Sequence, residues 1–141
     1  MPIFLPNNPQ VTLPLTTKKK GETVVPYSSG LNWGQRPGRN PNQAYLPVPV
    51  EVQRLPFFPD RGEYFLIECD DKKIFKCVRA QANGKAIETP ADNSLLGVYF
   101  RERLGVPLGH LVTINHLLRY GRVSYDIYRI ESHKFLLDFS V

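Results

Sequence analysis

Short runs of strand-like alternation, each followed within a few residues by a turn, dominate the centre of the chain. Residues 64–69 and 74–79 alternate apolar and polar side chains on either side of an acidic turn at 70–72, which predicts a β-hairpin. The second strand is expected to run on to residues 83–84, an Asn-Gly pair that favours a two-residue turn. The chain would then return along residues 85–88.

Two short helices are predicted between the strands. Polar residues 92–94 supply N-cap chemistry for a helix over residues 95–104, and Gly105 ends it. A second helix is expected over residues 113–120, with its first residue as the cap and Gly121 at its end. One face of the first helix carries the apolar side chains expected to enter the core: Leu96, Tyr99, Phe100 and Leu104.

The remaining strand-like segments complete a barrel. Residues 45–52 alternate like a strand, but their prolines confine the segment to an edge or a first strand. Residues 123–130 and 134–139 predict a final hairpin. With 141 residues the chain fits one domain, mainly β with two short helices. These short strands favour an open or nearly closed barrel of mainly antiparallel sheet.

The charge of the chain is concentrated near its beginning. Residues 1–50 carry five Lys and Arg side chains and one acid, a net of +4 out of +5 for the whole chain. A localised basic surface attracts a polyanion, either nucleic acid or an anionic membrane. No stretch approaches the ~20 apolar residues of a membrane span, and the basic segment lacks an amphipathic helical pattern. Nucleic acid is therefore the expected partner, with no membrane association.

Residues 28–43 lie in a stretch without carboxylates that extends from Glu22 to Glu51. Arginine forks read the O6/N7 edge of guanine, and Asn or Gln amides read the N6/N7 edge of adenine. This segment is accordingly a candidate DNA-reading loop, although Gly/Pro/Asn clusters are also common in ordinary surface loops. Trp33 is expected to anchor the loop in the core, with contact to sugar or base as the alternative. The candidate residues of the segment are Ser28, Ser29, Asn32, Trp33, Gln35, Arg36, Arg39, Asn40, Asn42 and Gln43.

A second candidate element surrounds the predicted turn at residues 83–84. Residues two apart on a strand share a face, so Arg79, Gln81 and Asn83 are expected to point together, with Lys85 just beyond the turn. Such a β-ribbon fits a major groove, and a solvated hairpin face is the alternative. The run Lys18, Lys19 and Lys20 is expected to be solvated or to neutralise phosphates without reading sequence.

Other chemistry finds little support in the sequence. Cys69 and Cys77 are expected to be reduced, buried core residues rather than a disulfide. No spacing of Cys and His indicates a metal site, and no motif indicates a cofactor. Asp60, Asp71 and Lys73 match the short pattern of a Mg²⁺-dependent nuclease, but Asp71 falls in a predicted turn, so this pattern is interpreted as coincidental.

Three ordered segments carry a family resemblance. The chain resembles the C-terminal domain of phospholipase-D-type restriction endonucleases, the BfiI/NgoFVII-like group. The resemblance is carried by residues 29–36 with 40–45, residues 92–101, and residues 120–122 with 138–140. The resemblance implies an open seven-stranded antiparallel DNA-binding pseudobarrel of the plant B-three type. In such domains two arms hold the major groove of double-stranded DNA. The arms would fall here on residues 28–43 and 79–93, which adds Asp92 and Asn93 to the candidate contacts.

The resemblance also implies a partner domain. In that family the nuclease domain lies N-terminal to the recognition domain, so residues 1–23 are expected to be a linker and residues 24–141 the recognition domain of a longer bacterial, cytoplasmic protein. This part of the protein would be monomeric, would need no cofactor and would not itself be an enzyme. The alternatives are a stand-alone Mg²⁺-dependent nuclease and a DNA- or RNA-binding regulator of the same fold.

Overall fold

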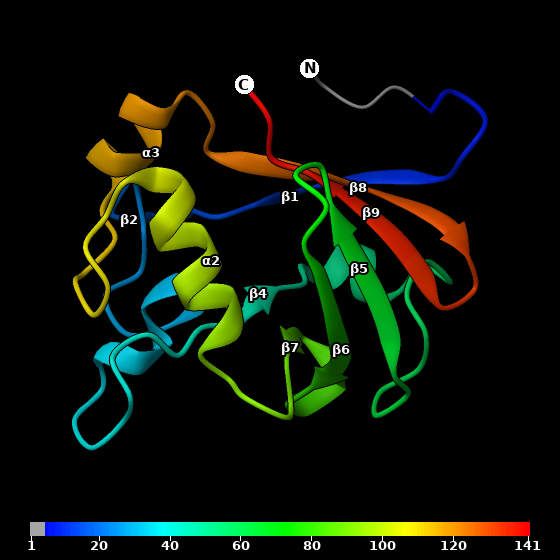
Figure 1. The fold of residues 1–141 in the computed structure, drawn as a ribbon, viewed down its shortest axis with the longest axis horizontal. Helices are drawn as coiled ribbons and strands as arrows, with labels where there is room; N and C mark the ends of the chain where they lie inside the picture. Colours follow the sequence, from blue (N-terminus) through cyan, green and yellow to red (C-terminus); the bar gives the residue numbers. More distant parts are fainter. Residues whose placement is uncertain (1–4) are drawn as a thin grey trace.

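A seven-stranded sheet curls into an open barrel in the computed structural model, which describes residues 5–141 (Figure 1). Residues 1–4 of the expected linker lie outside the described residues. The first and last strands of the sheet are edges, so a seam separates them. In order across the sheet, the strands are β1 (Gln10–Pro14), β8 (Ser124–Glu131), β9 (Lys134–Asp138), β5 (Phe65–Cys69), β6 (Ile74–Ala80), β7 (Ala86–Glu88) and β4 (Leu46–Pro47).

The expected pseudobarrel is confirmed, with one parallel pair in an otherwise antiparallel sheet. β5 and β9 run parallel, with Leu66 opposite Lys134 and Cys69 opposite Leu137. The pair is parallel because the chain crosses from β7 through two helices before it returns as the hairpin β8–β9. The other five strand pairs of this sheet are antiparallel.

Part of the segment expected to be a linker belongs to the barrel. β1 pairs with β8 from Gln10 opposite Tyr128 to Pro14 opposite Ser124, and Leu13 is fully buried. A separate hairpin follows, formed by β2 (Thr17–Lys19) and β3 (Glu22–Val24). These three strands were not predicted from the sequence.

Both predicted helices form close to their expected bounds. α2 (Leu95–Leu104) ends at Gly105 in the left-handed conformation, and α3 (Ile114–Tyr120) begins with a reciprocal capping box between Thr113 and His116. Ser94 precedes α2, but its side chain makes no hydrogen bond to the first turn of the helix, so the expected N-cap bond does not form. Ser94 instead donates its N–H and Oγ–H to Asp92, and these bonds lower the Asp92 pKa.

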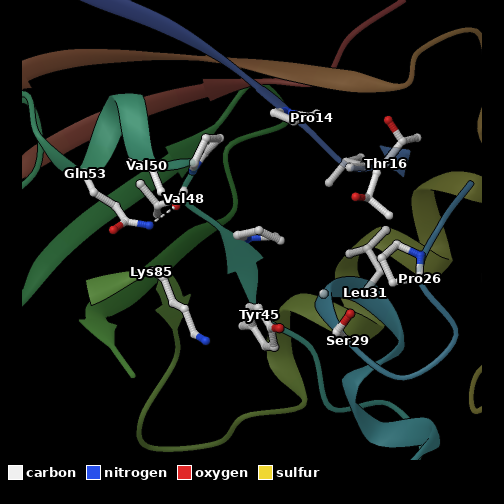
Figure 2. Close-up of a pocket in the computed structure, with 15 residues that line it drawn as sticks. Pro14, Thr16, Pro26, Ser29, Leu31, Tyr45, Val48, Val50, Gln53 and Lys85 are labelled. Carbon is white, nitrogen blue, oxygen red and sulfur yellow. Dashed lines mark hydrogen bonds between the residues drawn. The ribbon is translucent and has the colours of Figure 1, made fainter. Parts of the chain in front are cut away.

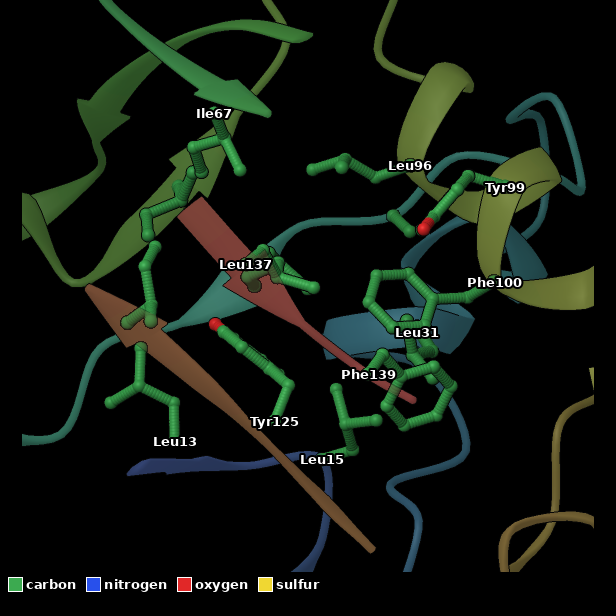
Figure 3. Packing of buried hydrophobic residues seen from close by; sticks show 14 of the residues in the cluster. Leu13, Leu15, Leu31, Ile67, Leu96, Tyr99, Phe100, Tyr125, Leu137 and Phe139 are labelled. Atoms are coloured by element: carbon green, nitrogen blue, oxygen red, sulfur yellow. The ribbon is translucent and has the colours of Figure 1, made fainter. Parts of the chain in front are cut away.

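The barrel interior and the inner face of α2 share one apolar core. Figure 3 shows Leu96 and Phe100 of α2 directed toward Leu31, Leu137 and Phe139, and all five side chains are buried. Phe100 packs edge-on against Phe139 with ring centroids 5.1 Å apart. α2 therefore holds the segment around Leu31 against the sheet.

The two cysteines are free and buried, as expected. Cys77 lies opposite Phe65, whereas the Cys69 N–H donates to the Lys73 carbonyl, so the thiols do not face each other across the hairpin. Burial raises the pKa of the Cys69 thiol to about 12 and also raises that of Cys77. Both side chains act as small apolar core groups.

The segment 45–52 is only partly a strand. Leu46–Pro47 forms the edge strand β4, as its prolines suggested, but Val50–Gln53 is a short helix, α1. Proline fixes φ and has no N–H to donate, which shortens the strand and suits Pro49 to the start of a helix.

A partly buried ion pair fastens β5 to the C-terminal strand. The Asp70 carboxylate accepts bonds from Arg103 Nη1 at 2.7 Å and from the Phe139 N–H at 2.8 Å. Burial alone would raise the Asp70 pKa, but these bonds outweigh it and lower the pKa. Arg103 also donates to the Tyr120 hydroxyl and the Phe139 carbonyl, so α2, α3 and β9 meet at one guanidinium.

Replacement of Asp70 by Asn should reduce stability in a pH-dependent way. At neutral pH the free energy of unfolding should fall by about 1–3 kcal/mol, because the bonds to the ionised group are weakened. A carboxyl whose folded pKa is lowered stabilises the protein above its ordinary pKa of 3.8, and this contribution disappears as the pH falls through the folded value. Urea titrations of wild type and Asp70→Asn should therefore give a difference in the free energy of unfolding that is smaller at pH 3 than at pH 7. The exposed Asp60→Asn variant should stay within about 0.5 kcal/mol of wild type at both pH values.

Candidate nucleic-acid interface

The first expected arm begins with a short 3₁₀ helix, η1 (Gly30–Gln35), whose Asn32 is fully buried. Asn32 Nδ2 donates to the carbonyls of Pro26 at 2.7 Å and Val112 at 2.8 Å. Its Oδ1 accepts from the Val112 N–H and from Arg101. Asn32 thus has its polar atoms bound inside the protein and has none to offer a base.

Arg101 completes this buried network. Its guanidinium has no exposed surface and donates to the His110 carbonyl at 2.9 Å, the Gly97 carbonyl at 3.2 Å and Asn32 Oδ1 at 3.4 Å. Burial lowers its pKa, and no ion pair involving it is found among residues 5–141. Arg101 therefore fixes η1 to α2 through neutral acceptors alone.

An aromatic stack holds the basic part of this arm. The Arg39 guanidinium lies 3.9 Å from the centroid of the Trp33 ring, and Trp33 packs edge-on against Tyr45 at 5.3 Å. Arg36 is exposed and donates through Nε to the Ser28 carbonyl at 2.8 Å. Trp33 is half-buried and is not part of the buried apolar core, so the expected anchoring in the core is not seen; the ring packs instead against Tyr45 and Arg39.

The far half of the arm packs against the loop before α3. Gln35 Nε2 donates to the carbonyls of Pro41 and Gly109, and Asn42 Oδ1 accepts from the Gly109 N–H. Gly97 of α2 touches this half so closely that a Cβ at that position would overlap the Asn42 carbonyl. Gln35 and Asn42 therefore shape the arm from within.

Three buried polar atoms of the arms lack a hydrogen-bond partner in the described part of the chain: Arg39 Nε, Gln43 Oε1 and Asn93 Oδ1. The Ala44 N–H donates to the Asn93 carbonyl, which joins the end of the first arm to the end of the second. Asn40 is exposed, and its Oδ1 accepts from the Asn42 N–H.

The second arm differs from the predicted two-residue turn. β6 and β7 are joined by residues 81–85, which include the 3₁₀ turn η2 (Ala82–Gly84) and positive φ values at Gln81 (64°) and Asn83 (59°). The longer connection arises because Arg79 organises it. Arg79 is buried and donates to the carbonyls of Gly84, Asn83 and Pro59.

The predicted shared face of this arm is consequently wrong. Arg79 continues the inward face of β6, whereas Gln81 donates to Glu88 and the Asn83 side chain is exposed in the turn. Lys85 is also exposed. Asn83 and Lys85 remain the accessible polar side chains at the tip of the second arm.

A hollow of about 540 Å³ occupies the seam of the barrel, between Pro14 at the end of β1 and Pro47 of β4. Figure 2 shows Lys85 on one side of it and Ser29 on the other, with Tyr45 between them. The two expected arms thus meet across this hollow, although only the near end of the first arm takes part.

Further hollows adjoin it on both sides and form what we call the seam groove. Toward the β2–β3 hairpin, the next hollow is lined by Lys18, Lys19 and Ser28 and shares Ser29 with the central one. At the opposite end, a hollow of about 520 Å³ is lined by Val50, Gln53, Arg54 and Asn83. Val50 and Gln53 also line the central hollow. No carboxylate lines any of these three hollows.

The contrast with another hollow of the molecule shows that this charge distribution is local. The hollow beside Phe57 is lined by Asp60, Glu63 and Glu131 as well as by Arg129 and His133.

The lysine run lies at the tip of the β2–β3 hairpin. Lys19 pairs with Glu22, and Lys20 and Gly21 form the turn with φ values of 51° and 80°. Lys18 Nζ donates to the Thr23 hydroxyl, and all three lysines are exposed. A run expected to be solvated or to neutralise phosphates therefore lies at the end of the seam groove.

The residues of the alternative nuclease do not form a site. Asp71 lies in the turn between β5 and β6 and accepts from the Tyr99 hydroxyl. Asp60 lies at the other end of the same hairpin, since the neighbouring Gly62 N–H donates to the Arg79 carbonyl. No group of three or more metal-binding side chains occurs within residues 5–141.

A family model of the NgoFVII C-terminal B3-like DNA-binding domain matches residues 5–131. The chain belongs to this family. The match confirms the resemblance found in the sequence and makes DNA binding, rather than catalysis, the described role of the family. None of the curated proteins compared with the chain matches it. Within the described residues, no helix has the length and apolarity needed to cross a membrane.

Sequence reasoning did not find several residues of the seam groove. Tyr45 belongs to the segment 45–52 that was expected to be an edge strand, whereas no element was predicted at Gln53 and Arg54. The acid-free stretch that ends before Glu51 included Tyr45, but Gln53 and Arg54 lie beyond it.

Replacement of Asn32 by Ala should loosen the first arm and destabilise the protein. The substitution leaves the Val112 N–H and the Nη2 group of Arg101 without their buried acceptor, which should lower the free energy of unfolding by about 1–3 kcal/mol. Urea denaturation measures the loss, and hydrogen exchange at the Val112 amide should accelerate. The exposed Asn115→Ala substitution on α3 is the control. If exchange at Val112 is equally slow in Asn32→Ala, the network does not hold the arm.

Proposed function

We propose that this domain recognises a specific sequence of double-stranded DNA by placing its seam groove against the major groove. The observation that carries the proposal is the seam groove, where Lys18, Lys19, Lys85 and Arg54 line three adjoining hollows without any carboxylate. Cationic side chains in a groove whose lining holds no carboxylate attract the phosphate backbone at every approach distance within the Debye length. Membership of a DNA-binding family supports the same conclusion.

The two arms supply different kinds of contact. Ser28, Ser29 and Arg36 are the candidate readers at the near end of the first arm, and Asn83 and Lys85 are those at the tip of the second. Arg and Lys donate to the O6/N7 edge of guanine, and Asn pairs with adenine. The other proposed contacts lie farther along the arms and are Trp33, Arg39, Asn40, Gln43, Gln81, Asp92 and Asn93. Asn32, Gln35, Asn42 and Arg79 serve instead to position the arms, because their polar groups bind within the protein.

The β2–β3 hairpin has a separate role in this proposal. Lys18, Lys19 and Lys20 neutralise phosphates at the end of the seam groove and carry no sequence information. A turn with two positive φ values matches the twist of its strands, so the hairpin presents these charges from a defined backbone.

We further propose that the domain binds as a monomer to an asymmetric site, since two arms on one chain need no dimer symmetry. Cleavage would come from a separate phospholipase-D-type catalytic domain of a bacterial, cytoplasmic restriction endonuclease. The separation of Asp60 and Asp71 supports assigning recognition alone to this chain.

Substitutions in the groove should separate readers from phosphate contacts. Asn83→Ala and Lys85→Ala should each weaken binding to the selected site by about 1–3 kcal/mol and relax the preference at one base position. Lys18→Ala should weaken binding to all DNA sequences alike and lower the slope of log affinity against log salt concentration by about 1. Affinity for a site selected from randomised duplexes and for scrambled DNA, at two salt concentrations, distinguishes these effects.

The exposed Lys134→Ala substitution on β9, outside the seam groove, is the matched control and should change neither the affinity for the two DNAs nor the salt slope. If the ratio of specific to scrambled affinity is unchanged in Asn83→Ala, Lys85→Ala and Arg36→Ala, the recognition surface lies elsewhere.

A further inference from the structure

The end of the seam groove beside α1 contains an arginine that belongs to neither arm. Arg54 follows the last residue of α1 and lines the same hollow of about 520 Å³ as Asn83 at the tip of the second arm. It is the only arginine among the residues that line the three hollows of the groove.

The Arg54 side chain is exposed and unengaged. Within residues 5–141 it takes part in no hydrogen bond, ion pair or ring contact of its guanidinium. Arg79, Arg101 and Arg103 differ from it, since each donates to several groups inside the protein. Arg54 therefore keeps all of its donors for a ligand.

The backbone beneath Arg54 is nevertheless held to the second arm. The Arg54 N–H donates to the Val50 carbonyl, and Gln53 Nε2 donates to the Val48 carbonyl at 2.6 Å. The Val48 N–H in turn donates to the carbonyl of Lys85 at 2.8 Å. The bonds from Gln53 to Val48 and from Val48 to Lys85 thus fix α1 relative to the turn that carries Asn83 and Lys85.

We propose that Arg54 is a third base-reading element, which recognises guanine at one end of the DNA site. The inference rests on the proposed function, since it requires the second arm to enter the major groove. An arginine fork donates to the O6 and N7 atoms of guanine as a pair, and a site next to Asn83 brings the fork to the base edges that the arm reaches. The DNA site would then extend at least one base pair beyond the arms, on the side of α1.

A charge-conserving substitution tests the inference. Wild type, Arg54→Ala and Arg54→Lys are each used to select a consensus from randomised duplexes, and affinities are measured for the wild-type site and for scrambled DNA. Preference for guanine at one terminal position should disappear in Arg54→Ala, and affinity for the wild-type site should fall about 5- to 150-fold. Arg54→Lys should lose most of this preference although it keeps the charge. Arg119→Ala, at an exposed arginine of α3 outside the groove, should leave the consensus unchanged.

Two other outcomes would overturn the inference in different ways. If Arg54→Ala weakens binding to the wild-type site and to scrambled DNA equally, and Arg54→Lys restores that binding, Arg54 contacts phosphate. If both variants select the wild-type consensus at wild-type affinity, Arg54 does not touch DNA, while the proposed function still holds. Failure of the wild-type protein itself to prefer any duplex would instead refute the proposed function.

Discussion

The hydrogen bond between Arg101 and Asn32 is the interaction on which the position of the first expected arm depends. Arg101 joins α2, the loop before α3 and η1 without a carboxylate, and Asn32 extends the network to Pro26 and Val112. A buried guanidinium is tolerated only where hydrogen bonds replace its hydration. The burial is offset here by two carbonyl oxygens and one amide oxygen, which belong to α2, the loop before α3 and η1, so these three segments cannot move independently.

The same construction explains why two glycines are needed near this network. A Cβ at Gly97 would overlap the Asn42 carbonyl, and one at Gly34 would overlap the Asn40 carbonyl. The far half of the first arm therefore lies against α2 at backbone contact distance. In the proposed complex, an arm that is already ordered loses less conformational entropy on binding than a flexible loop would.

The sequence predicted the regular parts of the molecule well. The hairpin β5–β6, both main helices and the hairpin β8–β9 carry strong alternation or capping residues, and each forms where the local pattern places it. β1 and the β2–β3 hairpin were missed because tertiary pairing with β8, and a turn at Lys20 and Gly21, create them rather than local propensity. The site was harder still to predict. Residue type identified Asn32 and Arg79 as readers, but burial, which only the folded chain determines, assigns both of them to internal hydrogen bonds.

The position of β9 has a consequence for how this chain folds. β9 is among the last residues of the chain, yet it lies in the middle of the sheet, between β8 and β5. The half of the sheet that contains β5, β6, β7 and β4 is joined to β1 and β8 only through this strand. Such non-local pairings raise contact order and slow folding. During synthesis, the two half-sheets would each expose an unpaired strand edge until β9 is made, so they can join only after that strand is complete.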